Sequence, residues 1–259
     1  LRVEYHTDED VVYAVNGLDL TIGKGESLGL VGETGAGKTT TALSVLRLIA
    51  DPPGKIMGGE IWFEGEDMLQ AKPARLREIR GSKISVIFQD PMTSLNPVYS
   101  VGDQIAEVIH QHEKCSKEEG RRKAGDMLEM VGIPRARYDE YPHQFSGGMK
   151  QRVVIAMSIA CSPELILADE PTTALDVTIQ AQILELLKKL NRESGISMLF
   201  ISHNLNVVRK LCRRVAVMQK GLLVEEGDTD QVFYHPRHPY TQKLIDAIPT
   251  RKRKEERHD

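Results

Sequence analysis

Two kinds of apolar pattern succeed one another along most of the chain. Short apolar runs predict five buried strands, at residues 28–31, 84–88, 165–168, 198–202 and 215–218. Elsewhere the apolar residues recur at helical spacing, most clearly over residues 179–190, where Gly195 ends the pattern. Strands that alternate with helices predict an α/β fold, with a mainly parallel sheet covered on both faces.

The first 80 residues add further elements. Their β-rich and alternating segments predict three strands, at residues 11–15, 18–22 and 60–64. A stretch without Pro or Gly predicts a helix at 39–48, and a segment that begins with proline predicts another at 73–80. Residues 1–22 are thus expected to form two strands ahead of the first buried strand.

The pattern changes after residue 90. Residues 91–102 are typical of a loop, and residues 103–111 are typical of a helix. A capping box at 116–119 opens a further helix that ends before Gly132. Because no strand pattern returns until the third apolar run, we predict an all-helical insert over residues 90 to about 160.

The composition is globular, with 259 residues, 41% hydrophobic and 27% charged. The net charge of −3 gives no support to nucleic-acid binding, although it does not exclude a local basic patch. Three scattered cysteines, without a C-x-x-C pair, indicate a reduced cytosolic chain and no cysteine metal site; Cys161 and Cys212 are expected in the core. No apolar run approaches a membrane span, and no signal peptide is visible. If the protein acts at a membrane, we therefore expect it to do so from the cytosolic side, through partner proteins.

A phosphate-binding loop lies between the first buried strand and a helix. It matches G-x-x-x-x-G-K-[ST] with Gly32, Glu33, Thr34, Gly35, Ala36, Gly37, Lys38 and Thr39. Its glycines let backbone N–H groups turn toward phosphate, and the helix N-terminus adds partial positive charge. Lys38 is placed to reach the β- and γ-phosphates, and the Thr39 hydroxyl to ligate Mg²⁺. A chance Gly-rich turn is the alternative, which the strand–loop–helix context disfavours.

Two further groups of polar residues follow apolar strands. Asp169 and Glu170 end the run at 165–168, where paired carboxylates suit Mg²⁺ and water activation beside a phosphate loop; a solvated strand end is the alternative. His203 follows the run at 198–202, at the carboxyl edge where parallel sheets bind ligands. It could hydrogen-bond a γ-phosphate, or simply pack or lie at the surface.

Two more features are compatible with nucleotide. Ser146, Gly147 and Gly148 begin a helix and form a second candidate anion site, although such a turn is usually only a helix start. Tyr5 or Tyr13 could stack on an adenine ring, and either could equally be core or edge packing.

Together these motifs resemble the ATP-binding cassette (ABC) family, over nearly the whole chain and in the expected order. Residues 32–39 resemble the Walker A motif, residues 145–152 resemble the family signature, and residues 165–170 resemble Walker B. Gln89 matches the Q-loop, residues 173–176 match the D-loop, and His203 matches the switch histidine. Segments 88–107, 169–184 and 235–249 further resemble ATPase subunits of dipeptide, oligopeptide and nickel importers. Phe145 replaces the usual Leu, and Asn204 replaces the common Asp.

The resemblance implies an ATPase that uses ATP and Mg²⁺. It implies Mg²⁺ ligation by Thr39, Gln89 and Asp169, catalysis by Glu170, His203 and Lys38, and adenine stacking by Tyr5 with Tyr13 as runner-up. It assigns further nucleotide contacts to the loop residues 32–39, Thr40, Ser146, Gly147, Gly148 and Asp176. Ser146–Gly148 would act on the ATP site of a second subunit, so that the working unit is a homo- or heterodimer closed by ATP.

The family's fold implies a P-loop (RecA-like) core with an N-terminal antiparallel β subdomain. We expect this subdomain and the Walker A part at 1–89, the helical subdomain at 90–162, the rest of the core at 163–234 and a C-terminal extension at 235–259. We do not carry over the cysteine-rich iron–sulfur segment of many relatives, and the basic run at 251–259 is expected to be a solvated tail.

The expected partners are transmembrane permease subunits, a second cassette ATPase and, indirectly, an extracellular solute-binding protein, with no nucleic acid. This places the chain at the cytoplasmic face of the membrane, powering peptide uptake. Import of nickel or another small solute is the first alternative. A soluble non-transport cassette ATPase and a regulatory module without turnover are the others.

Overall fold

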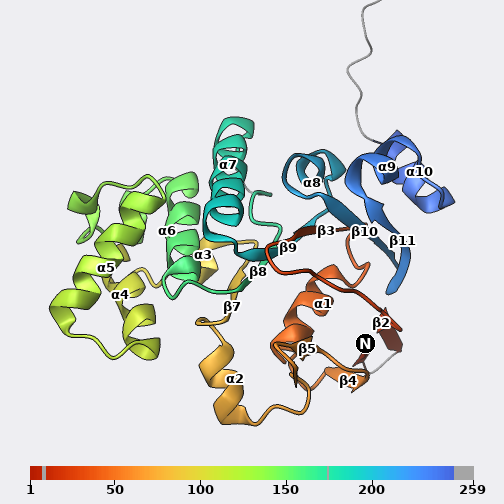
Figure 1. Ribbon diagram of the computed structural model, residues 1–259, viewed down its shortest axis with the longest axis horizontal. Coiled ribbons are helices and arrows are strands. Elements are labelled where there is room, and N and C mark those ends of the chain that lie inside the picture. The colour runs from red at the N-terminus through yellow and green to blue at the C-terminus, as the bar shows by residue number, and fades with distance from the viewer. Residues whose placement is uncertain (8–9, 174, 248–259) are drawn as a thin grey trace, which may run out of the picture.

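A six-stranded sheet runs through the computed structural model, which describes residues 1–7, 10–173 and 175–247 (Figure 1). In spatial order its strands are β11 Leu222–Asp228, β10 Arg214–Gln219, β3 Ser27–Val31, β9 Ser197–Ser202, β8 Leu165–Asp169 and β7 Ile84–Ile87. Only β11 pairs antiparallel within this sheet; the other neighbours are parallel. The mainly parallel sheet is confirmed. Strand β11 was not predicted, because it is a half-exposed edge strand whose acidic residues interrupt the apolar pattern.

Apolar side chains cover both faces of this sheet. The helices packed on it include α1 Lys38–Val45, α7 Val177–Ser194 and α8 Leu205–Leu211. Leu167 of β8 belongs to one cluster with Ala42 of α1, while its neighbour Ile166 belongs to the other cluster with Leu187 of α7. Figure 1 shows α1 on one side of the sheet and α7 and α8 on the other. Because successive strand residues face opposite sides, burial of both faces requires the uninterrupted apolar runs of the sequence.

The N-terminal residues form a separate three-stranded antiparallel sheet. Its order is β2 Val11–Asn16, β1 Arg2–His6 and β4 Gly54–Gly58. The expected antiparallel β subdomain is therefore confirmed, but one of its predicted strands is wrong. Residues 18–22 form no strand: Leu18 is buried with Val3 and Val15 while the backbone joins no ladder. The apolar alternation there reflects packing, which by itself does not supply a pairing partner.

Two other predicted elements differ in extent, and a third agrees. The strand expected at 60–64 shrinks to β5 Trp62–Phe63, paired with β6 Glu66–Asp67 in a small hairpin. The helix expected at 39–48 ends at Val45, because Arg47 adopts a left-handed backbone with φ 50°. Helix α2, Pro73–Ile79, agrees with its prediction.

The segment that follows β7 is helical, as predicted. It contains α3 Pro91–Ser94, α4 Val101–His112, α5 Lys117–Met130, the 3₁₀ turns η1 Arg135–Arg137 and η2 Pro142–Gln144, and α6 Gly147–Ile159. Ser116 caps α5 by accepting the N–H of Glu119, as the capping box predicts. Helix α3 replaces part of the predicted loop, because Asp90 caps it and Pro91 favours a first helical turn.

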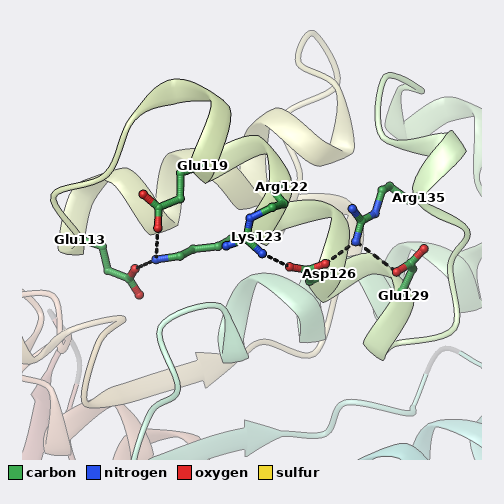
Figure 2. Close-up of polar contacts among 7 residues, drawn as sticks. All are labelled: Glu113, Glu119, Arg122, Lys123, Asp126, Glu129 and Arg135. Atoms are coloured by element: carbon green, nitrogen blue, oxygen red, sulfur yellow. Dashed lines mark hydrogen bonds and ion pairs between the residues drawn. The ribbon is translucent and has the colours of Figure 1, made fainter.

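Ion pairs join α5 to the elements at its two ends (Figure 2). Lys123 binds Glu113, just after α4, and Glu119 in the first turn of α5. At the other end Arg135 binds Asp126 and Glu129. These side chains are partly exposed, so each pair contributes at most about 1 kcal/mol.

Two short helices complete the described chain, α9 Thr229–Tyr234 and α10 Pro239–Asp246, and the basic run at 251–259 lies outside it. Cys212 is buried, as expected, whereas Cys161 is only partly buried. Over the ranges that the structure describes, none of the helices combines the length and the apolar character that crossing a bilayer demands.

Candidate functional site

The loop between β3 and α1 depends on its glycines. Gly32, Gly35 and Gly37 all have positive φ, of 154°, 80° and 99°. A Cβ at Gly37 would lie 2.0 Å from the carbonyl oxygen of Ala14, and one at Gly32 would lie 2.2 Å from that of Met218. Only glycine fits against these backbones, so the close approach that the motif predicts is present.

Lys38 reaches back across this loop. Its side chain is buried, and Nζ donates to the carbonyl oxygens of Gly32 and Glu33, at 2.8 Å each. Burial lowers the pKa of Lys38, whereas the nearby carboxylates of Glu170 and Asp169 act to raise it. The ammonium is thus desolvated and held beside the loop amides, where an anionic phosphate would find a strong partner.

Asp169 ends β8 in a buried position. Its Oδ1 is buried and has no hydrogen-bond partner among the described residues. Burial raises the pKa of Asp169, and the nearby Thr39 hydroxyl opposes that rise. An unpaired carboxylate oxygen beside a hydroxyl is the kind of oxygen donor that Mg²⁺ prefers, so these residues fit the expected ion.

Gln89 leaves the sheet at the same edge. Strand β7 pairs in parallel with β8, with Ile87 opposite Ala168, so Gln89 follows its strand as Glu170 follows β8. The side chain is exposed and makes no hydrogen bond within the described residues. It is therefore free to contact a ligand at that edge.

Glu170 and His203 contact each other directly. Glu170 Oε2 accepts a hydrogen bond from His203 Nδ1 at 3.0 Å and another from the Thr173 hydroxyl at 2.9 Å. Glu170 also has a left-handed backbone, with φ 47°, and its N–H donates to the carbonyl oxygen of Ile201 on β9. Such a conformation costs free energy in a non-glycine residue and clusters at functional sites. The sequence predicted each residue but carried no signal for the Thr173 contact.

The other predicted anion site lies apart from the phosphate loop. Ser146 caps α6 by accepting the N–H of Met149 at 3.4 Å, and Ser146 and Gly147 are exposed. A Cβ at Gly148 would lie 2.3 Å from Ile179 Cγ2 of α7. Within the described parts of the chain, no hydrogen bond joins Ser146–Gly148 to residues 32–40. The structure thus does not bring the two predicted anion sites together.

Asp176 serves as the cap of α7. Its carboxylate accepts the N–H groups of Thr178 and Ile179, at 3.0 Å each. Ala174, which belongs to the same predicted motif, lies outside the described residues.

The candidate adenine partners differ in exposure. Tyr5 is half-buried on β1, and its hydroxyl lies 3.4 Å from the Thr40 hydroxyl, so it is linked to the start of α1. Tyr13 on β2 is 58% exposed. Tyr5 is therefore tied to the phosphate-loop helix, and its role in binding adenine stays a prediction.

Comparisons with known proteins agree with this geometry. A family model described as ABC transporter matches residues 15–173, and a model described as the oligopeptide/dipeptide transporter C-terminal region matches residues 224–259. The oligopeptide transport ATP-binding protein OppD of Bacillus subtilis is 51% identical over 96% of this chain and 70% of its own length. The dipeptide transport ATP-binding protein DppD of the same organism is 47% identical over 96% of this chain and 75% of its own.

A solved structure extends the likeness to the fold. The ATP-binding cassette MJ0796, in a dimeric post-hydrolysis state bound to ADP and phosphate, superimposes with a TM-score of 0.77 at 31% identity. The match covers 88% of this chain and 96% of that one. The likeness of fold therefore extends over almost the whole of that cassette.

Proposed function

The chain belongs to the ABC transporter family of ATP-binding proteins, and we propose that it powers peptide import with the site built around Lys38. It binds and hydrolyses ATP. The observation that carries the residue assignment is that Lys38, buried and bonded to the glycine loop, lies near enough to the carboxylates of Asp169 and Glu170 for both to act on its pKa. This arrangement supplies an anion-binding charge, a cation-binding carboxylate and a group able to accept a proton within one site.

The phosphates of ATP would bind to the loop amides and Lys38. Lys38 Nζ would exchange its bonds to the carbonyl oxygens of Gly32 and Glu33 for phosphate oxygens. Thr39, Gln89 and Asp169 would hold Mg²⁺, which when bound supplies positive charge against the phosphate oxygens. Tyr5 would stack on the adenine.

Glu170 would polarise the attacking water. As the water oxygen bonds to the γ-phosphorus, the bond from that phosphorus to the β–γ bridging oxygen breaks, and Glu170 takes up the water proton. His203, which donates to Glu170 Oε2 in this structure, would hold the carboxylate in place and steady the γ-phosphate. Most of the acceleration would come from donors that are already in position.

The exposed start of α6 supports a site shared between two chains. Ser146 and Gly147 are exposed, and no hydrogen bond among the described residues joins them to the phosphate loop of the same chain. A second cassette subunit, identical or related, would offer its phosphate loop to this helix start, and Asp176 would lie near that junction. ATP would then bridge the two subunits, and hydrolysis would release them.

The working complex would include membrane proteins. The helical segment over residues 90–162 would contact permease subunits from the cytoplasmic face, and an extracellular binding protein would select the cargo. The cassette core would be divided between residues 1–89 and 163–234, with an extension at 235–259. The match of residues 224–259 to the oligopeptide/dipeptide transporter model favours peptide as that cargo.

A pull-down in mild detergent from the native cells tests this function, with cells that carry the untagged chain as the control. We expect two membrane subunits, a second cassette ATPase and a binding protein that carries peptide, all identified by mass. A binding protein loaded with a nickel chelate would support the importer function and contradict peptide as its cargo. Soluble partners alone, in several detergents, would contradict the importer and favour a soluble cassette ATPase.

A further inference from the structure

One peptide group of the phosphate loop is held from both sides. The peptide between Gly32 and Glu33 presents its carbonyl oxygen to Lys38 Nζ at 2.8 Å, and its N–H donates to the hydroxyl of Tyr240 at 3.0 Å. Because a trans peptide is planar, its C=O and N–H point in opposite directions. Lys38 and Tyr240 therefore fix the orientation of this one group between them.

Tyr240 comes from the far end of the described chain. It lies in the first turn of α10, and its side chain is 6% exposed although its hydroxyl touches the loop. Burial raises the pKa of Tyr240, so the hydroxyl stays neutral near pH 7 and can accept the N–H of Glu33. A residue some 200 positions away thus supplies a specific polar contact to the loop.

The segment before Tyr240 is anchored on the central sheet. The Glu225 carboxylate of β11 accepts the N–H of Arg237 at 2.9 Å and that of His238 at 3.0 Å. Burial acts to raise the pKa of Glu225, but these hydrogen bonds, together with the nearby Thr241 hydroxyl and His238 ring, outweigh it and leave the pKa below its ordinary value. His238 Nδ1 then accepts the N–H of Tyr240 at 3.2 Å and caps α10. The tyrosine therefore approaches the loop from a fixed position.

We propose that Tyr240 is a positioning residue of the nucleotide site, which acts on Lys38 through the Gly32–Glu33 peptide. This inference rests on the proposed role of that loop in binding ATP. Before ATP binds, the bond to Tyr240 fixes the carbonyl that accepts Lys38. When Lys38 exchanges that carbonyl for phosphate, Tyr240 still holds the N–H of the same peptide, so the loop does not have to be ordered again. The C-terminal segment would then serve the ATP site directly, in addition to packing on the sheet.

The substitution Tyr240→Phe in the full-length chain removes the hydroxyl and keeps the ring. Loss of one hydrogen bond of ordinary net strength should weaken nucleotide affinity by about three- to tenfold. The bond supports ground state and transition state alike, so KM for ATP should rise while kcat stays within about twofold. Amide exchange at Glu33, followed by NMR or on a short peptic fragment, should become faster.

Tyr234→Phe is the matched control. Tyr234 lies in the same C-terminal region, but its hydroxyl accepts from Arg209 on α8, away from the loop. We expect this variant to keep native affinity, KM and Glu33 exchange. Thermal unfolding of both variants separates a general loss of stability from an effect on the loop.

The outcomes separate this inference from the function on which it rests. If the native chain binds ATP and Lys38→Ala does not, while Tyr240→Phe matches the native affinity and Glu33 exchange, the positioning role is wrong and the site stands. Equal losses in Tyr240→Phe and Tyr234→Phe would also overturn it. If Lys38→Ala binds ATP as the native chain does, the proposed loop fails and this inference fails with it.

Discussion

The two predicted anion sites of this chain differ in how completely one chain builds them. At the phosphate loop, Lys38 is buried, bound to two carbonyl oxygens and faced by Asp169 and Glu170. At the start of α6, Ser146 and Gly147 are exposed, and the Ser146 hydroxyl caps the helix. The first arrangement can bind a ligand within one molecule, whereas the second needs a partner surface to close over it.

Because of this difference, substitutions at the two sites should affect different measurements. Changes at the buried site should alter nucleotide binding or turnover in any state of assembly. Changes at the exposed helix start should act only when two subunits meet. The predictions below use that contrast, in order of decreasing effect.

Glu170→Gln should have the largest effect and should break the site at its chemical step. Amide replaces the carboxylate that takes up the proton of water, so turnover should fall about 100-fold or more while ATP still binds. Phosphate release, measured beside nucleotide affinity, checks this. Glu164→Gln is the control: Glu164 directly precedes the first residue of β8, and its variant should keep near-native turnover. Near-native hydrolysis by Glu170→Gln would remove Glu170 from its role.

Lys38→Ala should weaken ATP binding by about 10- to 100-fold, because charge-assisted hydrogen bonds to phosphate are lost. Calorimetric titration with ATP measures this loss. Lys189→Ala, on an exposed part of α7, is the control and should bind ATP within about twofold of the native chain. Equal affinity in both variants would argue against the loop assignment.

Ser146→Arg should sharpen the contrast, since it lies at the exposed site. A long cation at this helix start should reduce ATP-driven dimerisation at least about tenfold by blocking approach, while ATP binding by the monomer stays within about twofold. Light scattering of the Glu170→Gln background with ATP follows the dimer. Ser116→Arg removes the equivalent cap of α5 and is the control. Normal dimerisation of Ser146→Arg would contradict a shared site.

Asp169→Asn should have the smallest effect of the four variants. It should raise the free energy of unfolding, so that the folded chain becomes more stable. The pKa of Asp169 is raised on folding, so the stability it contributes is present below its unfolded value near 3.8 and is lost as pH rises through the folded value. Asn does not titrate, so the variant should gain about 1 kcal/mol at pH 7 and less at pH 4, in denaturation without nucleotide.

The same variant should lose function while it gains stability, because the carboxylate that fits Mg²⁺ is gone. ATP hydrolysis should need a higher Mg²⁺ concentration. Asp139→Asn, at a largely exposed position, should change neither property. A less stable Asp169→Asn chain at pH 7 would show that the buried carboxylate is already compensated.

Much of the fold follows from local pattern. The apolar runs that became β3, β7, β8, β9 and β10 are uninterrupted because both sheet faces are buried, so the sequence alone predicts them. The loop at 32–39 and the carboxylates after β8 are likewise contiguous in sequence. Edge elements such as β11 were missed, and residues 18–22 were mistaken for a strand, because pairing depends on a partner that local sequence does not contain.

The sequence by itself determined the order of strands and helices, the phosphate loop and the residue types of the site, since these depend on spacing within a few positions. Only the tertiary structure decided which of them meet. It joined Glu170 to His203 across two parallel strands, left Asp169 Oδ1 unpaired, separated Ser146 from the loop and brought Tyr240 to the N–H of Glu33. Those contacts depend on how distant segments pack, and no pattern of neighbouring residues specifies that.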